Sequence, residues 1–99
     1  MIKVLMSWNI QAGREHEYFE FIVEEFGPGL NELGVKVTDS WYTQYGDQPQ
    51  IVMGGVTQDV GSMQNALGSP KWHRLREKLL GYITDYNQKV IQATGGFQL

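Results

Sequence analysis

The stretch IKVLMSWNI, residues 2 to 10, alternates regularly between two kinds of side chain. One set of alternate residues mixes Leu5 with polar side chains, and the other set is wholly apolar. The apolar set is Ile2, Val4, Met6, Trp8 and Ile10. Because successive side chains of a strand point to opposite faces, the pattern predicts a strand with one apolar face and one mixed face.

After Gly13 the apolar residues recur at spacings of three and four, which is typical of a helix with one buried side. The buried set expected from this spacing is His16, Phe19, Val23, Phe26, Leu30 and Leu33. Pro28 has no N–H to offer the carbonyl of Glu24, so we expect a break or kink there. Gly34 is placed to end the helix in the left-handed conformation.

Further along the chain, Asp59 is expected to cap a short helix that Gly68 ends, and Ser69 with Pro70 to start another. This last helix is expected to bury Trp72, Leu75, Leu79 and Ile83. Residues 89 to 94, KVIQAT, read as the final strand.

Residues 35 to 45 and 50 to 57 are rich in β-branched and aromatic side chains, and GDQP at 46 to 49 between them is turn chemistry. They predict a hairpin, which completes the order β-α-β-β-α-β. Short connections and right-handed crossovers favour an antiparallel sheet in the order 4-1-3-2, with both helical segments on one face. The expected fold is therefore an α+β, ferredoxin-like plait that occupies residues 1 to 99 as one domain.

The composition excludes several function classes. With 99 residues, no cysteine and a formal net charge of −3, the chain offers neither a disulfide scaffold nor a thiolate metal site. The acidic balance opposes nucleic acid as a partner, and the short apolar runs oppose a membrane partner. We expect a cytoplasmic protein.

The mixed face of the sheet predicts self-association. Leu5 shares that face with Ser7 and Asn9, and Tyr42 is expected there as well. With both helical segments on the opposite side, this face would be an exposed apolar patch, so a homodimer is expected.

Three segments carry a resemblance that covers the whole chain: NIQAGRE (9 to 15), DSWYTQYGD (39 to 47) and SPKW (69 to 72). In its element order the chain resembles the dimeric α+β barrel superfamily. Trp41, Thr43 and Gly46 are similar to a pattern of the NIPSNAP-like proteins, which are close to small antibiotic-biosynthesis-monooxygenase-like proteins. The resemblance implies homodimerisation and a cavity between helices and sheet, and its relatives include cofactor-free oxygenases and isomerases.

His16 and Asp39 are the candidate catalytic residues. His16 shares the spacing of the buried helical residues, so its imidazole is expected to face the sheet, where it could move protons or simply complete the packing. Asp39 alternates with Val37 and Trp41 on the expected inner face, where it either pairs with His16 or Arg76 or escapes to solvent at the strand end.

The candidate ligand-binding residues are Trp8, Trp41, Trp72, His73 and Arg76. The tryptophans suit an apolar ligand and equally suit a small core or an interface. Arg76 with His73 could hold an anion, whereas charge pairing with the acidic first helix explains the same cations without a ligand. One of Gly54 and Gly55 leaves a gap on the helix side that is either ligand space or filled by a tryptophan.

No metal is expected, because only two histidines occur and none of the metal-binding spacings accompanies them. No cofactor is expected either. The sequence thus favours a homodimer that binds a small apolar or aromatic molecule between helices and sheet, as a cofactor-free oxygenase or isomerase if it is an enzyme. The alternative is a non-catalytic homodimerisation module.

Overall fold

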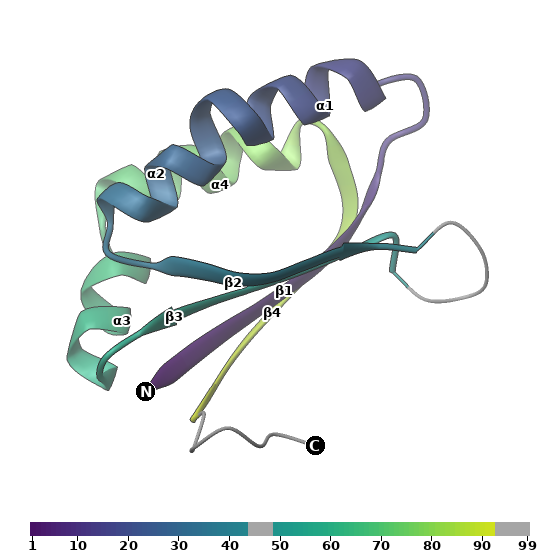
Figure 1. Cartoon of the computed structure of the whole chain (residues 1–99). Helices are drawn as coiled ribbons and strands as arrows, with labels where there is room; N and C mark the ends of the chain where they lie inside the picture. The colour runs from purple at the N-terminus through teal and green to yellow at the C-terminus, as the bar shows by residue number, and fades with distance from the viewer. Residues whose placement is uncertain (44–48, 93–99) are drawn as a thin grey trace.

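A computed structural model describes residues 1–43 and 49–92 of the chain, and Figure 1 shows how its elements are arranged. Four strands and a set of helices follow one another in the predicted order. The elements are β1 (Ile2–Ile10), α1 (Glu15–Phe21), the π-helix η1 (Ile22–Phe26), α2 (Gly27–Glu32), β2 (Lys36–Tyr42), β3 (Ile51–Thr57), α3 (Val60–Leu67), α4 (Pro70–Leu80) and β4 (Ile83–Gln92).

The strands form one antiparallel sheet in the order β2-β3-β1-β4, which confirms the predicted 4-1-3-2 arrangement. The helices α1, α2 and α4 lie over the same face of this sheet (Figure 1). The alternation in β1 is as predicted, because its even-numbered residues are buried beneath those helices. We call the other side, which none of the described helices covers, the open face.

The first helix is continuous from Glu15 to Glu32, with no break at Pro28. It contains one π-helical turn directly before the proline, in which the Gly27 amide donates to the Ile22 carbonyl. A π turn holds one more residue than an α turn, so it shifts the buried side of the helix by one position.

This shift corrects the expected buried set. From the end of the π turn onward, Phe26 and Leu30 are buried as predicted, but earlier in the helix Tyr18 and Phe21 are buried in place of Phe19 and Val23. The prediction that His16 faces the sheet is wrong for the same reason. Its side chain is 91% exposed and lies 3.5 Å from the Glu20 carboxylate.

Gly34 ends this helix as predicted, with a φ of 82°. The Val35 amide donates to the Leu30 carbonyl and the Gly34 amide to the Asn31 carbonyl, 3.0 Å each, which is the Schellman pattern. The apolar side chains of Val35 and Leu30 are both buried there. The chain thereby turns directly into β2.

The predicted caps of the last two helices are confirmed. Asp59 accepts a hydrogen bond from the Ser62 amide (2.8 Å), and Ser69 accepts one from the Trp72 amide (3.1 Å). The helix α4 ends at Leu80, however, and β4 already begins at Ile83 rather than at residue 89. Ile83 therefore packs into the core from the strand, and residues 93 and 94 lie outside the described residues.

A β-bulge in β2 overturns the expected faces of that strand. Its pairing with β3 passes from Val37 opposite Gly55 to Asp39 opposite Gly54, which leaves Thr38 as an extra residue. Directly opposed residues share a face, so Asp39 lies on the open face rather than beneath the helices.

The same reversal applies beyond the bulge. Trp41 lies opposite Val52 on the open face, whereas Tyr42 lies opposite the buried Ile51 on the helix side. Both residues were expected on the other side. Residues 44 and 45 of the expected strand and 46–48 of the expected turn lie outside the described residues.

Candidate functional site

The space predicted to hold a ligand, between helices and sheet, is filled by aromatic side chains. Trp8 is fully buried, and its indole Nε1 donates to the Tyr18 hydroxyl (2.9 Å). Its ring lies edge-on to Phe26 and is stacked on Tyr86, with centroids 6.0 Å apart in each case. Burial raises the pKa of Tyr18 to about 12, so this hydroxyl stays neutral within the core.

The gap expected at the glycines of β3 is also filled. Gly55 is the one on the helix side, and a Cβ built there would lie 2.6 Å from Cγ1 of Val35. Val35, rather than a ligand or a tryptophan, therefore occupies this position.

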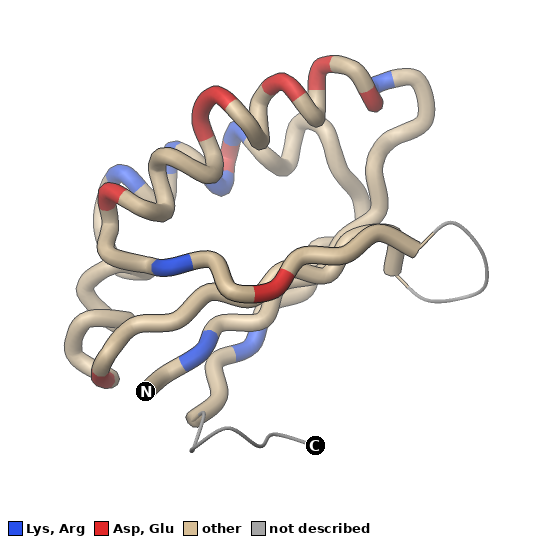
Figure 2. The backbone as a smooth tube through the Cα atoms, in the orientation of Figure 1, with Lys and Arg blue, Asp and Glu red and all other residues tan. Residues whose placement is uncertain are grey.

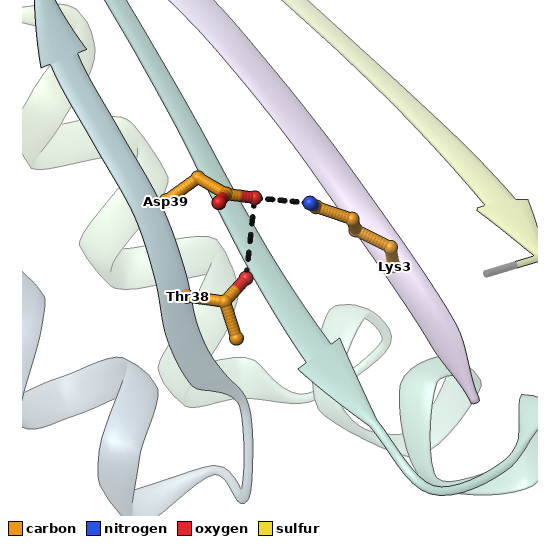
Figure 3. A network of polar contacts seen from close by, with 3 residues as sticks. All are labelled: Lys3, Thr38 and Asp39. Atoms are coloured by element: carbon orange, nitrogen blue, oxygen red, sulfur yellow. Dashed lines mark hydrogen bonds and ion pairs between the residues drawn. The ribbon is translucent and has the colours of Figure 1, made fainter. Parts of the chain in front are cut away.

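On the open face, Lys3 and Asp39 form an ion pair that crosses from β1 to β2 (Figure 3). The pair lies over Gly54 of the intervening strand, where a Cβ would come within 2.7 Å of the lysine chain. Thr38 donates to the same carboxylate oxygen of Asp39 (3.3 Å). The Lys3 ammonium lowers the pKa of Asp39, so the carboxylate is charged at neutral pH.

Apolar side chains surround this ion pair. Trp41 from β2 is 54% exposed, and four half-buried aliphatic residues come from the other three strands. These are Leu5, Val52, Val56 and Ile91. Leu5 and Val52 also line a groove of about 440 Å³ along this face.

Three of the predicted ligand-binding residues come together elsewhere, between α4 and β4. Trp72, His73 and Arg76 of α4 line a hollow of about 460 Å³ together with Tyr86 and Gln88 of β4, among others. Trp72 is buried in the floor, His73 is exposed, and the Arg76 guanidinium lies 5.3 Å from the centre of the Tyr86 ring. We call this the α4–β4 hollow.

The remaining candidates do not join this hollow. Trp8 is in the core, Trp41 is on the open face, and His16 is on the outer side of the helix layer. Asp39 pairs with Lys3 and not with His16 or Arg76. Their catalytic or binding roles stay predictions.

Sequence reasoning missed Lys3, Tyr86 and Gln88. Lys3 was visible through the alternation in β1, but its partner was assigned to the wrong face because the bulge gives no clear sequence signal. Tyr86 and Gln88 were missed because the final strand was expected to begin only at residue 89.

Charge pairing between the helices accounts for part of the basic character of α4. Lys78 pairs with Glu25 (2.7 Å) and Lys71 with Glu32, and Figure 2 shows acidic positions along α1 to α2 and basic positions along α4.

Within the part of the chain that the structure describes, no group of three His, Cys, Asp or Glu side chains is placed to hold a metal ion. No helix of residues 1–43 and 49–92 combines the length and apolar character needed to cross a membrane.

Solved structures with a similar fold span nearly the whole chain. A NIPSNAP domain protein from Burkholderia xenovorans is 13% identical, with a TM-score of 0.71 and 99% of both chains covered. A NIPSNAP family protein from Agrobacterium tumefaciens is 15% identical, with a TM-score of 0.74 and 96% of this chain and 94% of that chain covered. An antibiotic biosynthesis monooxygenase-like protein from Deinococcus radiodurans is 14% identical, with a TM-score of 0.73 and 100% of this chain and 98% of that chain covered.

This chain shares their ferredoxin-like fold. The predicted resemblance to NIPSNAP-like and antibiotic-biosynthesis-monooxygenase-like proteins is thus confirmed at the level of fold. No family model matches the sequence. No curated protein matches it either.

Proposed function

We propose that this protein acts as a homodimerisation module, in which two copies pack sheet to sheet through their open faces. The observation that carries the proposal is the make-up of that face. Aliphatic side chains and the exposed Trp41 surround an ion pair whose two charges neutralise each other. Lys36 and Lys89 lie on the two edge strands, so these two charges are at the rim of the face, and the centre holds the aliphatic side chains and the neutralised Lys3–Asp39 pair.

The size of the face agrees with this use. Four strands about 4.8 Å apart and about 25–30 Å long present a projected area on the order of 500 Å². Side-chain relief brings the accessible area closer to the ~800 Å² that each partner buries in a standard interface. Two such faces can stack with their side chains interdigitated, as in other sheet packings.

The proposal is tested by the solution mass of two matched variants. Trp41 and Val90 are both about half exposed and lie on edge strands, but Val90 pairs with Val4 on the helix side of the sheet. We expect Trp41→Glu to weaken the dimer at least tenfold, because each copy would bury an unpaired carboxylate. We expect Val90→Glu to leave it intact.

Size-exclusion chromatography with light scattering, over a range of protein concentrations, measures the molar mass of the wild type and of both variants. A wild-type chain that stays monomeric at high concentration would overturn the proposal. So would equal dissociation of the two variants. Far-UV circular dichroism shows whether each variant keeps its fold.

The placement of the polar candidates favours the module over a catalytic centre built from them. A site that uses His16, Asp39 and Arg76 needs them to converge. Here His16 is on the outer surface of the helices, Asp39 is on the open face, and Arg76 faces β4. Catalysis as an oxygenase or isomerase stays a prediction, since a shared fold does not carry an activity.

Small-molecule binding is the second candidate function. It is favoured by the α4–β4 hollow, which gathers Trp72, His73 and Arg76 beside two residues of β4. The exposed lining of this hollow is mainly polar, which suits a polar or charged ligand group, and Trp72 and Leu67 add an apolar part. The purified protein is denatured and extracted with organic solvent, and mass spectrometry of the extract tests whether the protein had retained a small organic molecule.

Two further expectations stay predictions. A cytoplasmic location is tested by fractionation of the source cells. The single domain is tested by limited proteolysis, which would leave the chain uncut between its elements.

A further inference from the structure

The α4–β4 hollow contains a cation, Arg76, that no carboxylate of the described residues pairs with. None of the ion pairs formed among residues 1–43 and 49–92 includes Arg76. On the same helix, Lys71 and Lys78 are both paired with carboxylates. Arg76 is therefore not part of the pairing between the two helices, although its side chain is half-buried.

The Tyr86 ring fixes the guanidinium without neutralising it. Arg76 lies over this ring at 5.3 Å from its centre, a cation–π contact. Burial raises the pKa of Tyr86 to about 12, with the neighbouring Arg76 offsetting part of the rise. The phenol is therefore neutral at physiological pH, and the full positive charge remains on Arg76.

The other polar groups of the hollow leave donors available. The Tyr86 hydroxyl donates to Oε1 of Gln88 (2.6 Å), which occupies the acceptor end of that carboxamide. Its NH2 group remains to donate to a ligand. His73, one turn before Arg76 on the same helix, adds an imidazole N–H at the exposed side.

The nearby acidic side chain belongs to another surface. Glu77 follows Arg76 in sequence but lines a shallow neighbouring area with His73, Arg74 and Lys78. Within residues 1–43 and 49–92, the rim of the α4–β4 hollow therefore presents a guanidinium that belongs to no ion pair, together with the N–H donors of Gln88 and His73.

We propose that the α4–β4 hollow binds the oxyanion group, a carboxylate or phosphate, of a small organic molecule. Arg76 supplies the charge and a planar fork of N–H groups that donates to two oxygens of the ligand, and the Gln88 NH2 group donates a third hydrogen bond. The buried Trp72 and the half-buried Leu67 offer a small apolar contact for the organic part. This inference rests on the proposed small-molecule binding and names its ligand class; it is independent of the dimer.

The test is a titration of the 15N-labelled protein with benzoate, phenyl phosphate and the neutral benzamide, followed by NMR. Benzoate and benzamide have the same ring and differ mainly in the charge of the head group. We expect either anion to bind at least tenfold more tightly than benzamide. The shifted signals should include the Gln88 NH2 group and the Trp72 indole.

Arg76→Gln and Arg74→Gln form the matched pair of variants. Both remove one positive charge from α4, but Arg74 does not line the hollow. Arg76→Gln should weaken benzoate binding at least tenfold and Arg74→Gln should not change it. A second variant, Gln88→Glu, places a carboxylate beside Arg76 and should abolish anion binding even if Arg76→Gln folds poorly.

Each other outcome overturns the inference. Equal binding of benzoate and benzamide in the hollow would leave a small-molecule site without anion selectivity. Equal weakening by both arginine variants would show that the anions respond only to the general charge of the helix. No shift with any of the three compounds would also remove small-molecule binding as a candidate function.

Discussion

Gly54 and Gly55 are neighbouring residues in β3 that face opposite sides of the sheet. A Cβ at Gly54 would meet the end of the Lys3 side chain, which can move into solvent. A Cβ at Gly55 would meet Val35, which is buried and β-branched. The two positions are therefore equivalent in strand geometry but not in packing.

We expect Gly55→Ala to destabilise the fold more than Gly54→Ala. Overpacking at Val35 should cost about 1–3 kcal/mol. In the monomer the loss at Gly54 should stay below about 1 kcal/mol, because an ion pair exposed on the open face contributes little. Urea unfolding at one protein concentration measures both values, and a larger loss for Gly54→Ala would contradict this assignment of the two faces.

The Lys3–Asp39 pair should make stability depend on pH. The pKa of Asp39 is lowered in the folded state, so its contribution is present above the unfolded pKa and is lost as the pH falls through the folded value. The side chain is 33% exposed, so the contribution is below about 1 kcal/mol.

We expect Asp39→Asn to lower the free energy of unfolding at pH 6–7, with a difference from wild type that shrinks as the pH falls below about 4, the ordinary range of an aspartate. Chemical unfolding of both proteins across these pH values is the measurement. A difference that stays constant with pH would show that the carboxylate charge does not stabilise the fold.

The sequence predicted the positions of most helices and strands correctly. It predicted less well which side of each element faces the core. The cap at Asp59, the start of α4 and the end at Gly34 depend on local chemistry, and all three were predictable. The π turn in the first helix and the bulge in β2 each insert one residue, which rotates the buried side of the helix and reverses the faces of the strand. A single inserted residue leaves little trace in a hydrophobic pattern, which is why His16 and Asp39 were misplaced.

The cap of α4 also supports the α4–β4 hollow. Ser69 accepts from the Trp72 amide and donates to the Ala66 carbonyl (2.8 Å). We expect Ser69→Ala to cost about 1 kcal/mol, because both groups lose a partner. Gln64→Ala is the control, since Gln64 is exposed in α3 and its side chain makes no hydrogen bond within the part of the chain that the structure describes. Thermal unfolding of the two variants should separate them; equal midpoints would show that the cap is dispensable.

At the scale of the whole molecule, the sheet order followed from the element order, because few topologies keep connections short and crossovers right-handed. The open face followed from the mixed alternation in β1. The location of the proposed ligand site was not predictable from the sequence. The expected interior space is filled by Trp8 and Val35, and the α4–β4 hollow uses residues of a strand that begins earlier than expected.

In the proposed homodimer, two copies of this chain meet through their open faces. An isotope-filtered NOE experiment on an equal mixture of labelled and unlabelled protein tests it most directly, because it detects only contacts between copies. We expect contacts from the methyl groups of Leu5, Val52 and Val56 and from the Trp41 ring. Contacts that come instead from Phe19 and Val23 on the helices, or no contacts between copies at all, would contradict this arrangement.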